Sequence, residues 1–139
     1  MAYATIAGDF PSSATTAPGV VALQRALMRA LTDSGVDVAD IGVCGTEGVY
    51  FATFAEELDG GIMVTASHNP PDYNGMKFVR EGSRPISADT GLGEMRAMID
   101  EGRLPGRAPC AGGVAPLAIE GNYLEHLLGT VSGAALKPL

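Results

Sequence analysis

"VDVADIGVCGTEGVYFATFAEELDGGIMVT", residues 36–65, is the stretch that decides the fold. Its first eight residues predict a strand and residues 45–58 predict a helix, with Thr46 in position to cap it. Residues 60–65 form an apolar run without polar alternation, which is typical of a strand buried on both faces. Strand, helix and strand joined by short links form a βαβ unit, so the strands are parallel and the crossover is right-handed.

The sequence on either side extends this unit into a layered domain. Residues 2–7 predict a weak strand and residues 18–34 an amphipathic helix. Residues 75–79 predict a strand that follows a loop too short for a parallel return, so it should pair antiparallel. We therefore expect a three-layer α/β/α domain with a mixed sheet and residues 60–65 at its centre. The remaining predicted segments are a helix in the second half of 87–102, a Gly- and Pro-rich linker at 102–116 and a short helix at 121–131.

Length and composition indicate one globular domain. The chain has 139 residues, 46% of them hydrophobic and 18% charged, which is unlike a disordered segment. Its net charge is −7 with only nine Lys and Arg, so a nucleic-acid partner is not expected. The two cysteines have no zinc or CxxC spacing. We find no signal sequence and no apolar run long enough for a bilayer, and therefore expect a cytoplasmic protein without a membrane partner.

The stretch "TASHNPPDYNGMK", residues 65–77, follows the central apolar strand. It puts Ser67 at the carboxyl end of a parallel strand, where ligands bind in open α/β sheets. Two prolines and an Asn-Gly pair stiffen the loop, which would hold the serine hydroxyl exposed. Lys77 lies in the next strand, with Met76 and Phe78 directed to the opposite face. Its ammonium can therefore reach over the strand ends towards Ser67.

A serine beside an ammonium suits phosphoryl transfer, in which positioning and charge neutralisation supply most of the acceleration. Spacing alone favours a plainer interpretation, in which Ser67 ends a strand, His68 is a solvated loop residue and Lys77 extends into solvent. Other catalytic patterns are absent from the sequence: it has no GxSxG serine elbow, no GxGxxG and no Walker loop.

The loop resembles the active-site serine loop of the α-D-phosphohexomutases, the family of phosphomannomutase and phosphoglucomutase. That family's pattern is T-[AG]-S-H-N-P-x-x-Y-N-G-x-K, and residues 65–77 fit every specified position. The flanking text "GVDVADIGVCGTEGVYFATF" and "VREGSRPISADTGL" is similar to the bacterial phosphomannomutase branch. The phosphoglucosamine mutase branch is less similar after "HNP".

The resemblance implies a role for each matching residue. Ser67 would carry the phosphoryl group, His68 would lie near the transferring phosphate, and Lys77 and Asn69 would contact the substrate. The phosphate on Ser67 would be one ligand of Mg²⁺. The reaction would move phosphate between O6 and O1 of a mannose or glucose phosphate, with a hexose 1,6-bisphosphate as activator.

The resemblance covers roughly residues 20–139, which match only the first of the family's four domains. Residues 1–19 are divergent: "GDFPSS" at 8–13 lacks the expected arginine, and the N-terminal strand is read as truncated or altered. Residues 132–139 are read as the start of a link to a second domain, and no DGDxDR metal loop is present. The chain is therefore expected to be inactive alone. The alternative is a non-catalytic remnant that acts as an interaction or oligomerisation module, self-associating through an open sheet edge.

Overall fold

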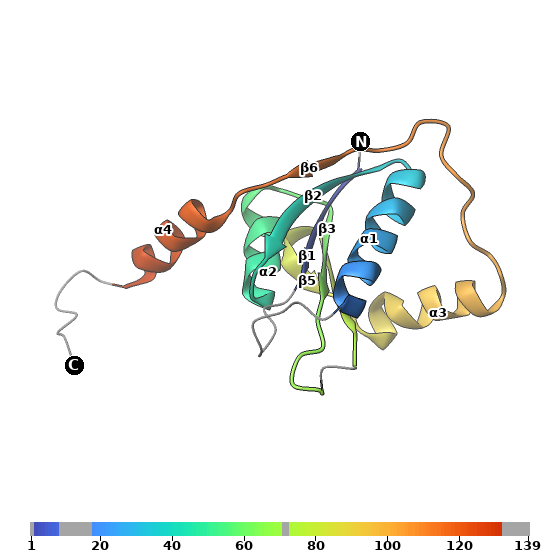
Figure 1. The fold of residues 1–139 in the computed structure, drawn as a ribbon, viewed down its shortest axis with the longest axis horizontal. Helices are drawn as coiled ribbons and strands as arrows, with labels where there is room; N and C mark the ends of the chain where they lie inside the picture. The colour runs from blue at the N-terminus through green and yellow to red at the C-terminus, as the bar shows by residue number, and fades with distance from the viewer. Residues whose placement is uncertain (1, 9–17, 71–72, 132–139) are drawn as a thin grey trace.

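Six strands in the described part of the chain form one mixed sheet with helices on both faces (Figure 1). This computed structural model describes residues 2–8, 18–70 and 73–131. The strand order is β5-β4-β3-β1-β2-β6, and β4 runs in the direction opposite to that of the other five strands. The strands are β1 (Ala2–Gly8), β2 (Val36–Val43), β3 (Gly60–Val64), β4 (Met76–Arg80), β5 (Arg84–Pro85) and β6 (Val114–Pro116), and the α-helices are α1 (Pro18–Asp33), α2 (Thr46–Ala55), α3 (Gly93–Asp100) and α4 (Glu120–Thr130).

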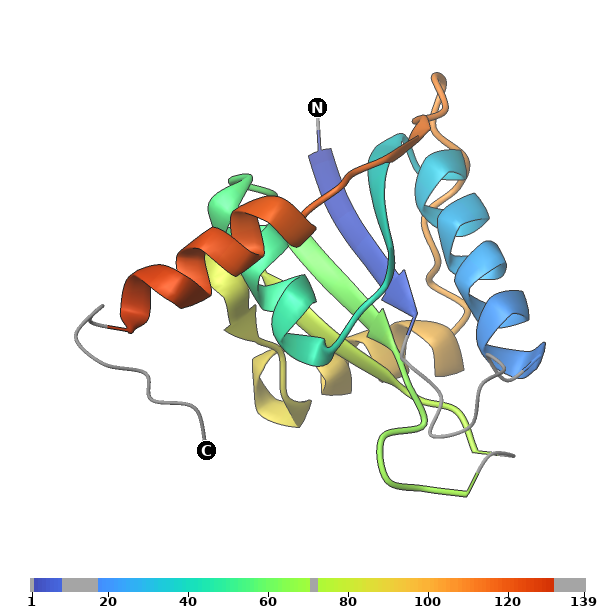
Figure 2. The same ribbon diagram turned by 60° about the vertical axis from the view of Figure 1, so that its left-hand side comes forward.

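The β2–α2–β3 unit is present as predicted, with β1 lying between its two strands. The chain moves in one direction across the sheet from β1 to β2, and in the other direction from β2 to β3. Because both crossovers join parallel strands and are right-handed, they put α1 and α2 on opposite faces, as Figures 1 and 2 show. The predicted three-layer architecture is confirmed.

Each face of the sheet carries its own buried cluster. On the α1 face, Ile6, Val38 and Ile62 pack with Leu27, Met28, Leu31 and Phe78. The other cluster, on the α2 face, comprises Ala7, Ile41, Val49, Ala52, Met63, Val79 and Ile119. Neighbouring residues of β3 thus enter different clusters, which is why its sequence shows no polar alternation.

The strand β3 is central, and β4 pairs with it antiparallel, as predicted. The N-terminal strand β1 is an inner strand, and the open edges of the sheet are β5 and β6. They have two and three residues, and each includes a proline, which has no N–H to donate. Such short edges offer a second chain few unpaired backbone groups.

Two predicted boundaries of α2 are wrong. Thr46 is the first helical residue rather than the cap, and Gly45 occupies the cap position without a side-chain hydrogen bond. The helix ends at Ala55, three residues early. Its end is a Schellman-type turn, in which the N–H of Leu58 donates to the carbonyl of Thr53 while Glu57 has φ 51°.

The C-terminal part of the described chain partly matches the predictions. Helices α3 and α4 lie where they are expected, but the predicted linker at 102–116 ends in β6, which pairs with β2. In Figure 1 α4 extends away from the sheet, and its Tyr123 and His126 rings lie against Phe51 of α2. No helix in the described ranges has both the length and the apolar character to cross a membrane. The expectations for residues 9–13 and 132–139 fall outside the described residues.

Candidate phosphoryl-transfer site

The serine loop lies at the point where the strand order reverses. From β1 the chain connects to β2 on one side, while β3 lies on the other side. In open α/β sheets, ligands bind beside the carboxyl ends of the strands at such a switch point. Residues 65–75 connect the carboxyl end of β3 to β4, so Ser67 follows the end of one of the two strands, β1 and β3, that flank the switch point.

Ser67 has an unusual backbone conformation. Its φ is 53°, in the left-handed region that few residues other than glycine adopt. Its backbone N–H donates to the hydroxyl of Thr65 over 2.7 Å, and Thr65 is itself buried. The side chain is exposed, and no hydrogen bond engages its hydroxyl within the described ranges. Strained backbone of this kind clusters at active sites, so it supports Ser67 as a functional residue.

The loop is held by local hydrogen bonds. The backbone N–H and side-chain amide of Asn69 both donate to the carbonyl of Ala66, each over 3.1 Å. The N–H of Thr65 donates to the carbonyl of Gly75, which closes the loop at its base. Asn69 therefore shapes the turn around Ser67, while the neighbouring His68 side chain is exposed.

Lys77 lies on β4 opposite Met63 of β3. Its neighbour Phe78 packs in the cluster on the α1 face, whereas Met63 belongs to the α2 face. The predicted alternation is therefore present, and Lys77 faces α2. Its Nζ donates a hydrogen bond over 3.1 Å to Oγ1 of Thr46, the first residue of α2.

Sequence reasoning missed this role of Thr46. It read the residue as a helix cap, which would occupy the hydroxyl with the helix's own backbone. Helix α2 follows β2, so its N-terminus lies at the carboxyl edge of the parallel strands, on the same side as the serine loop. Because 31 residues separate Thr46 from Lys77, only the folded arrangement reveals that they meet.

A family model named "Phosphoglucomutase/phosphomannomutase, alpha/beta/alpha domain I" matches residues 20–102. The chain belongs to this family. A phosphomannomutase of Salmonella typhimurium is 53% identical over 119 residues, which are 85% of this chain and 26% of the relative. A protein of Xanthomonas campestris named "Phosphohexose mutases" is 52% identical over 124 residues, 85% of this chain and 26% of the relative.

A solved structure of a phosphoglucomutase/phosphomannomutase family protein from Burkholderia thailandensis has the same fold. It superposes with a TM-score of 0.74 at 28% identity, over 96% of this chain and 29% of that chain. This chain thus spans about a quarter of the length of the phosphohexomutases that it matches.

Two other serines, Ser83 and Ser87, have hydroxyls that are already engaged in hydrogen bonds. The hydroxyl of Ser83 donates to the carbonyl of Tyr50. Ser87 donates to Asp89 and lies beside Thr90, and its hydrogen bond is the main cause that lowers the pKa of Asp89. Their engagement distinguishes both serines from Ser67.

The described residues do not form a metal site by themselves. Across residues 2–8, 18–70 and 73–131, no three His, Cys, Asp or Glu side chains are grouped so that they could hold an ion. In the described part of the loop, the residues next to Ser67 in the sequence offer hydroxyl, amide and imidazole groups rather than the carboxylates that Mg²⁺ prefers.

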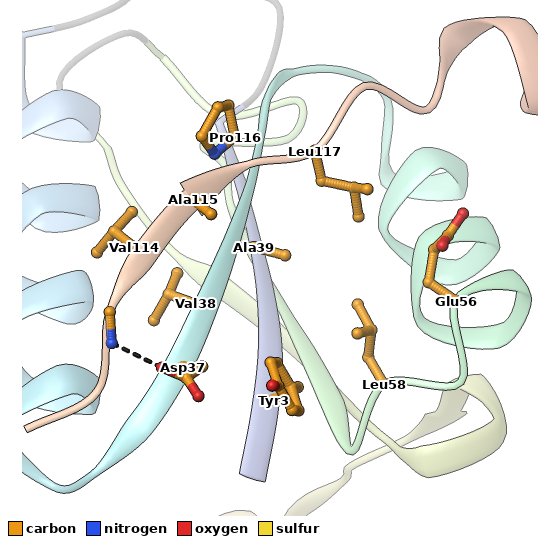
Figure 3. A pocket seen from close by; sticks show the side chains of 11 residues that line it. Tyr3, Asp37, Val38, Ala39, Glu56, Leu58, Val114, Ala115, Pro116 and Leu117 are labelled. Carbon is orange, nitrogen blue, oxygen red and sulfur yellow. Dashed lines mark hydrogen bonds between the residues drawn. The ribbon is translucent and has the colours of Figure 1, made fainter. Parts of the chain in front are cut away.

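A pocket of about 460 Å³ lies at the other end of the strands (Figure 3). Its lining includes Tyr3 and Asp37, each the second residue of its strand, and Glu56 just beyond the end of α2. Asp37 accepts a hydrogen bond from the N–H of Gly113, which holds the residue before β6 against β2. Tyr3 and Asp37 lie at the amino ends of β1 and β2, whereas the serine loop follows the carboxyl end of β3, so the pocket is separate from the serine loop.

Proposed function

We propose that this chain carries the phosphoserine loop of a phosphohexomutase, with Ser67 as the residue that holds the phosphoryl group. The observation that carries the proposal is the exposed Ser67 hydroxyl on a strained turn at the strand-order switch point. The family membership and its phosphomannomutase relatives support the same chemistry.

In the proposed reaction, the bond between phosphorus and Oγ of Ser67 breaks while a bond between phosphorus and a sugar hydroxyl oxygen forms, and the net result is that the hydroxyl proton passes to Oγ. The substrate would be a mannose or glucose phosphate, and the product of this step would be the 1,6-bisphosphate. Transfer of its other phosphate back to Oγ completes the exchange between O6 and O1. Lys77 would neutralise phosphate charge, and His68 and Asn69 would lie at the transferring group. A phosphoryl group on Ser67 would also add an oxygen ligand of the kind that Mg²⁺ prefers.

The expected phosphate acceptor can be identified directly. After incubation with glucose 1,6-bisphosphate, phosphopeptide mass spectrometry should find phosphate on Ser67. The Ser67→Ala variant should lose the label, whereas Ser83→Ala and Ser87→Ala should retain it, because these two hydroxyls are engaged elsewhere. Phosphate that persists in Ser67→Ala, or that maps to Ser83 or Ser87, would contradict the assignment.

We also propose that the 139-residue chain does not turn over alone. The alternative function, an interaction or oligomerisation module, would require self-association. The two- and three-residue edge strands give it little support. Light scattering at increasing concentrations would reveal a dimer if that alternative holds.

A further inference from the structure

The hydrogen bond between Thr46 and Lys77 joins the start of α2 to β4 at the candidate site. The acceptor is Oγ1 of Thr46 and the donor is Nζ of Lys77, 3.1 Å apart, and both residues are partly or fully exposed. A lysine ammonium has three N–H donors and no acceptor. One donor is used here, so two remain for an anion.

The hydroxyl of Thr46 does not cap helix α2. Gly45 occupies the cap position, and no side chain caps the helix there. Thr46 lies one residue inside the helix, where its hydroxyl meets Lys77 instead of the first turn's backbone N–H groups.

The charge arrangement argues against a purely stabilising contact. A helix N-terminus carries a partial positive charge, so a nearby cation is on the unfavourable end of the helix, an effect that the carboxylate of Glu47 in the first turn offsets in part. Lys77 is nevertheless tied to the first residue of α2. A hydrogen bond that holds an ammonium beside a partial positive charge prepares both to meet an anion, such as the phosphate of a sugar ester.

We propose that Thr46 is a positioning residue for phosphate binding: its hydroxyl holds the Lys77 ammonium at the carboxyl edge of the sheet, with two donors free for a phosphate ester. This inference rests on the proposed function. A free lysine loses considerable side-chain rotamer freedom when it is fixed. Anchoring by Thr46 means that part of this freedom is already lost before the ligand arrives, so binding is tighter.

The sequence makes this proposal easy to test, because the chain has only two lysines, Lys77 and Lys137. Selective ¹³C,¹⁵N-lysine labelling therefore gives two sets of side-chain NMR signals, and Lys77→Met assigns them. In the wild type and in Thr46→Ser, the two Hε protons of Lys77 should be inequivalent because the ammonium is anchored. In Thr46→Val, which keeps the shape and removes the hydroxyl, they should become equivalent.

Binding of glucose 1,6-bisphosphate, measured by calorimetry, tests the functional part. Thr46→Val should bind about five- to tenfold more weakly, as expected when one side chain must be immobilised on binding, and Thr46→Ser should match the wild type. In a Lys77→Met background, Thr46→Val should change nothing further. Circular dichroism checks that every variant is folded.

Each alternative outcome has a distinct meaning. If the wild type binds and Thr46→Val binds equally well, or if Thr46→Ser is as weak as Thr46→Val, the positioning role is wrong and the proposed function stands. If an additional loss appears in the Lys77→Met background, Thr46 acts other than through Lys77 and the inference fails. If the wild type binds no bisphosphate, although Thr46→Val still changes the Hε signals of Lys77, the contact is structural only. The positioning role of Thr46 and the proposed function then both fail for this chain.

Discussion

Replacing Gly61 with valine is expected to destabilise the domain by about 3 kcal/mol, the upper part of the range for overpacked cores. Gly61 lies on β3 beneath α2. A Cβ atom there would lie 2.5 Å from Oγ1 of Thr53 and 2.7 Å from Cγ1 of Val49. Both neighbours are buried and belong to α2, so the helix would have to move away from the sheet. That loss is a large fraction of the stability of an ordinary domain.

Gly106→Val is the matched control for this prediction. It makes the same exchange at an exposed position where a Cβ would meet no atom within 4 Å. Urea unfolding followed by far-UV circular dichroism should show a much lower midpoint for Gly61→Val and an almost unchanged one for Gly106→Val. Equal midpoints would mean that α2 does not pack as closely on β3 as the structure has it.

The central part of the fold could be predicted because its signals are local. The apolar run of β3 indicates a strand covered on both faces, and the short links on either side of α2 require a parallel pair. The direction of β4 follows from the length of residues 65–75, which cannot return the chain for a parallel strand. Each of these arguments uses only neighbouring residues.

Other features depend on contacts that the sequence pattern does not reveal. Helix α2 ends in a left-handed residue, Glu57, where a glycine would be the usual signal. The strand β6 has three exposed residues, and it reaches β2 because Gly112 lets two backbones approach: a Cβ there would lie 2.1 Å from the carbonyl oxygen of Val36. Composition alone makes such a segment look like a linker.

The candidate site divides in the same way. Ser67 and the alternation around Lys77 follow from strand geometry and could be predicted. The left-handed φ of Ser67 could not be predicted, because the usual sequence signal for this conformation is a glycine and this residue is a serine. The hydrogen bond of Lys77 could not be predicted either, because its partner lies 31 residues away. A threonine at the start of a helix is usually a cap, which is why its hydrogen bond to Lys77 was not predicted.

The 139-residue chain alone is expected to show no measurable mutase turnover. Phosphoryl transfer needs attacking and leaving oxygens in line and the charge of the transferring group neutralised. The described site supplies one serine hydroxyl and one ammonium, Lys77. A serine hydroxyl is a weak nucleophile without an activating base or metal, and each missing charge-stabilising donor typically costs about 10²–10³ in rate. Several such losses together should reduce turnover below detection.

A coupled assay with mannose 1-phosphate or glucose 1-phosphate, glucose 1,6-bisphosphate and Mg²⁺ measures this directly. The phosphomannomutase of Salmonella typhimurium, about four times the length of the matched segment, serves as the active control under the same conditions. The expected result is that Ser67 becomes phosphorylated but no turnover follows. Phosphorylation requires a single phosphoryl transfer to an exposed hydroxyl, whereas turnover requires that the sugar stays bound through two successive transfers. Robust turnover that disappears in Ser67→Ala would overturn the prediction, since it would mean that the chain assembles a complete site, for example by pairing with a second copy.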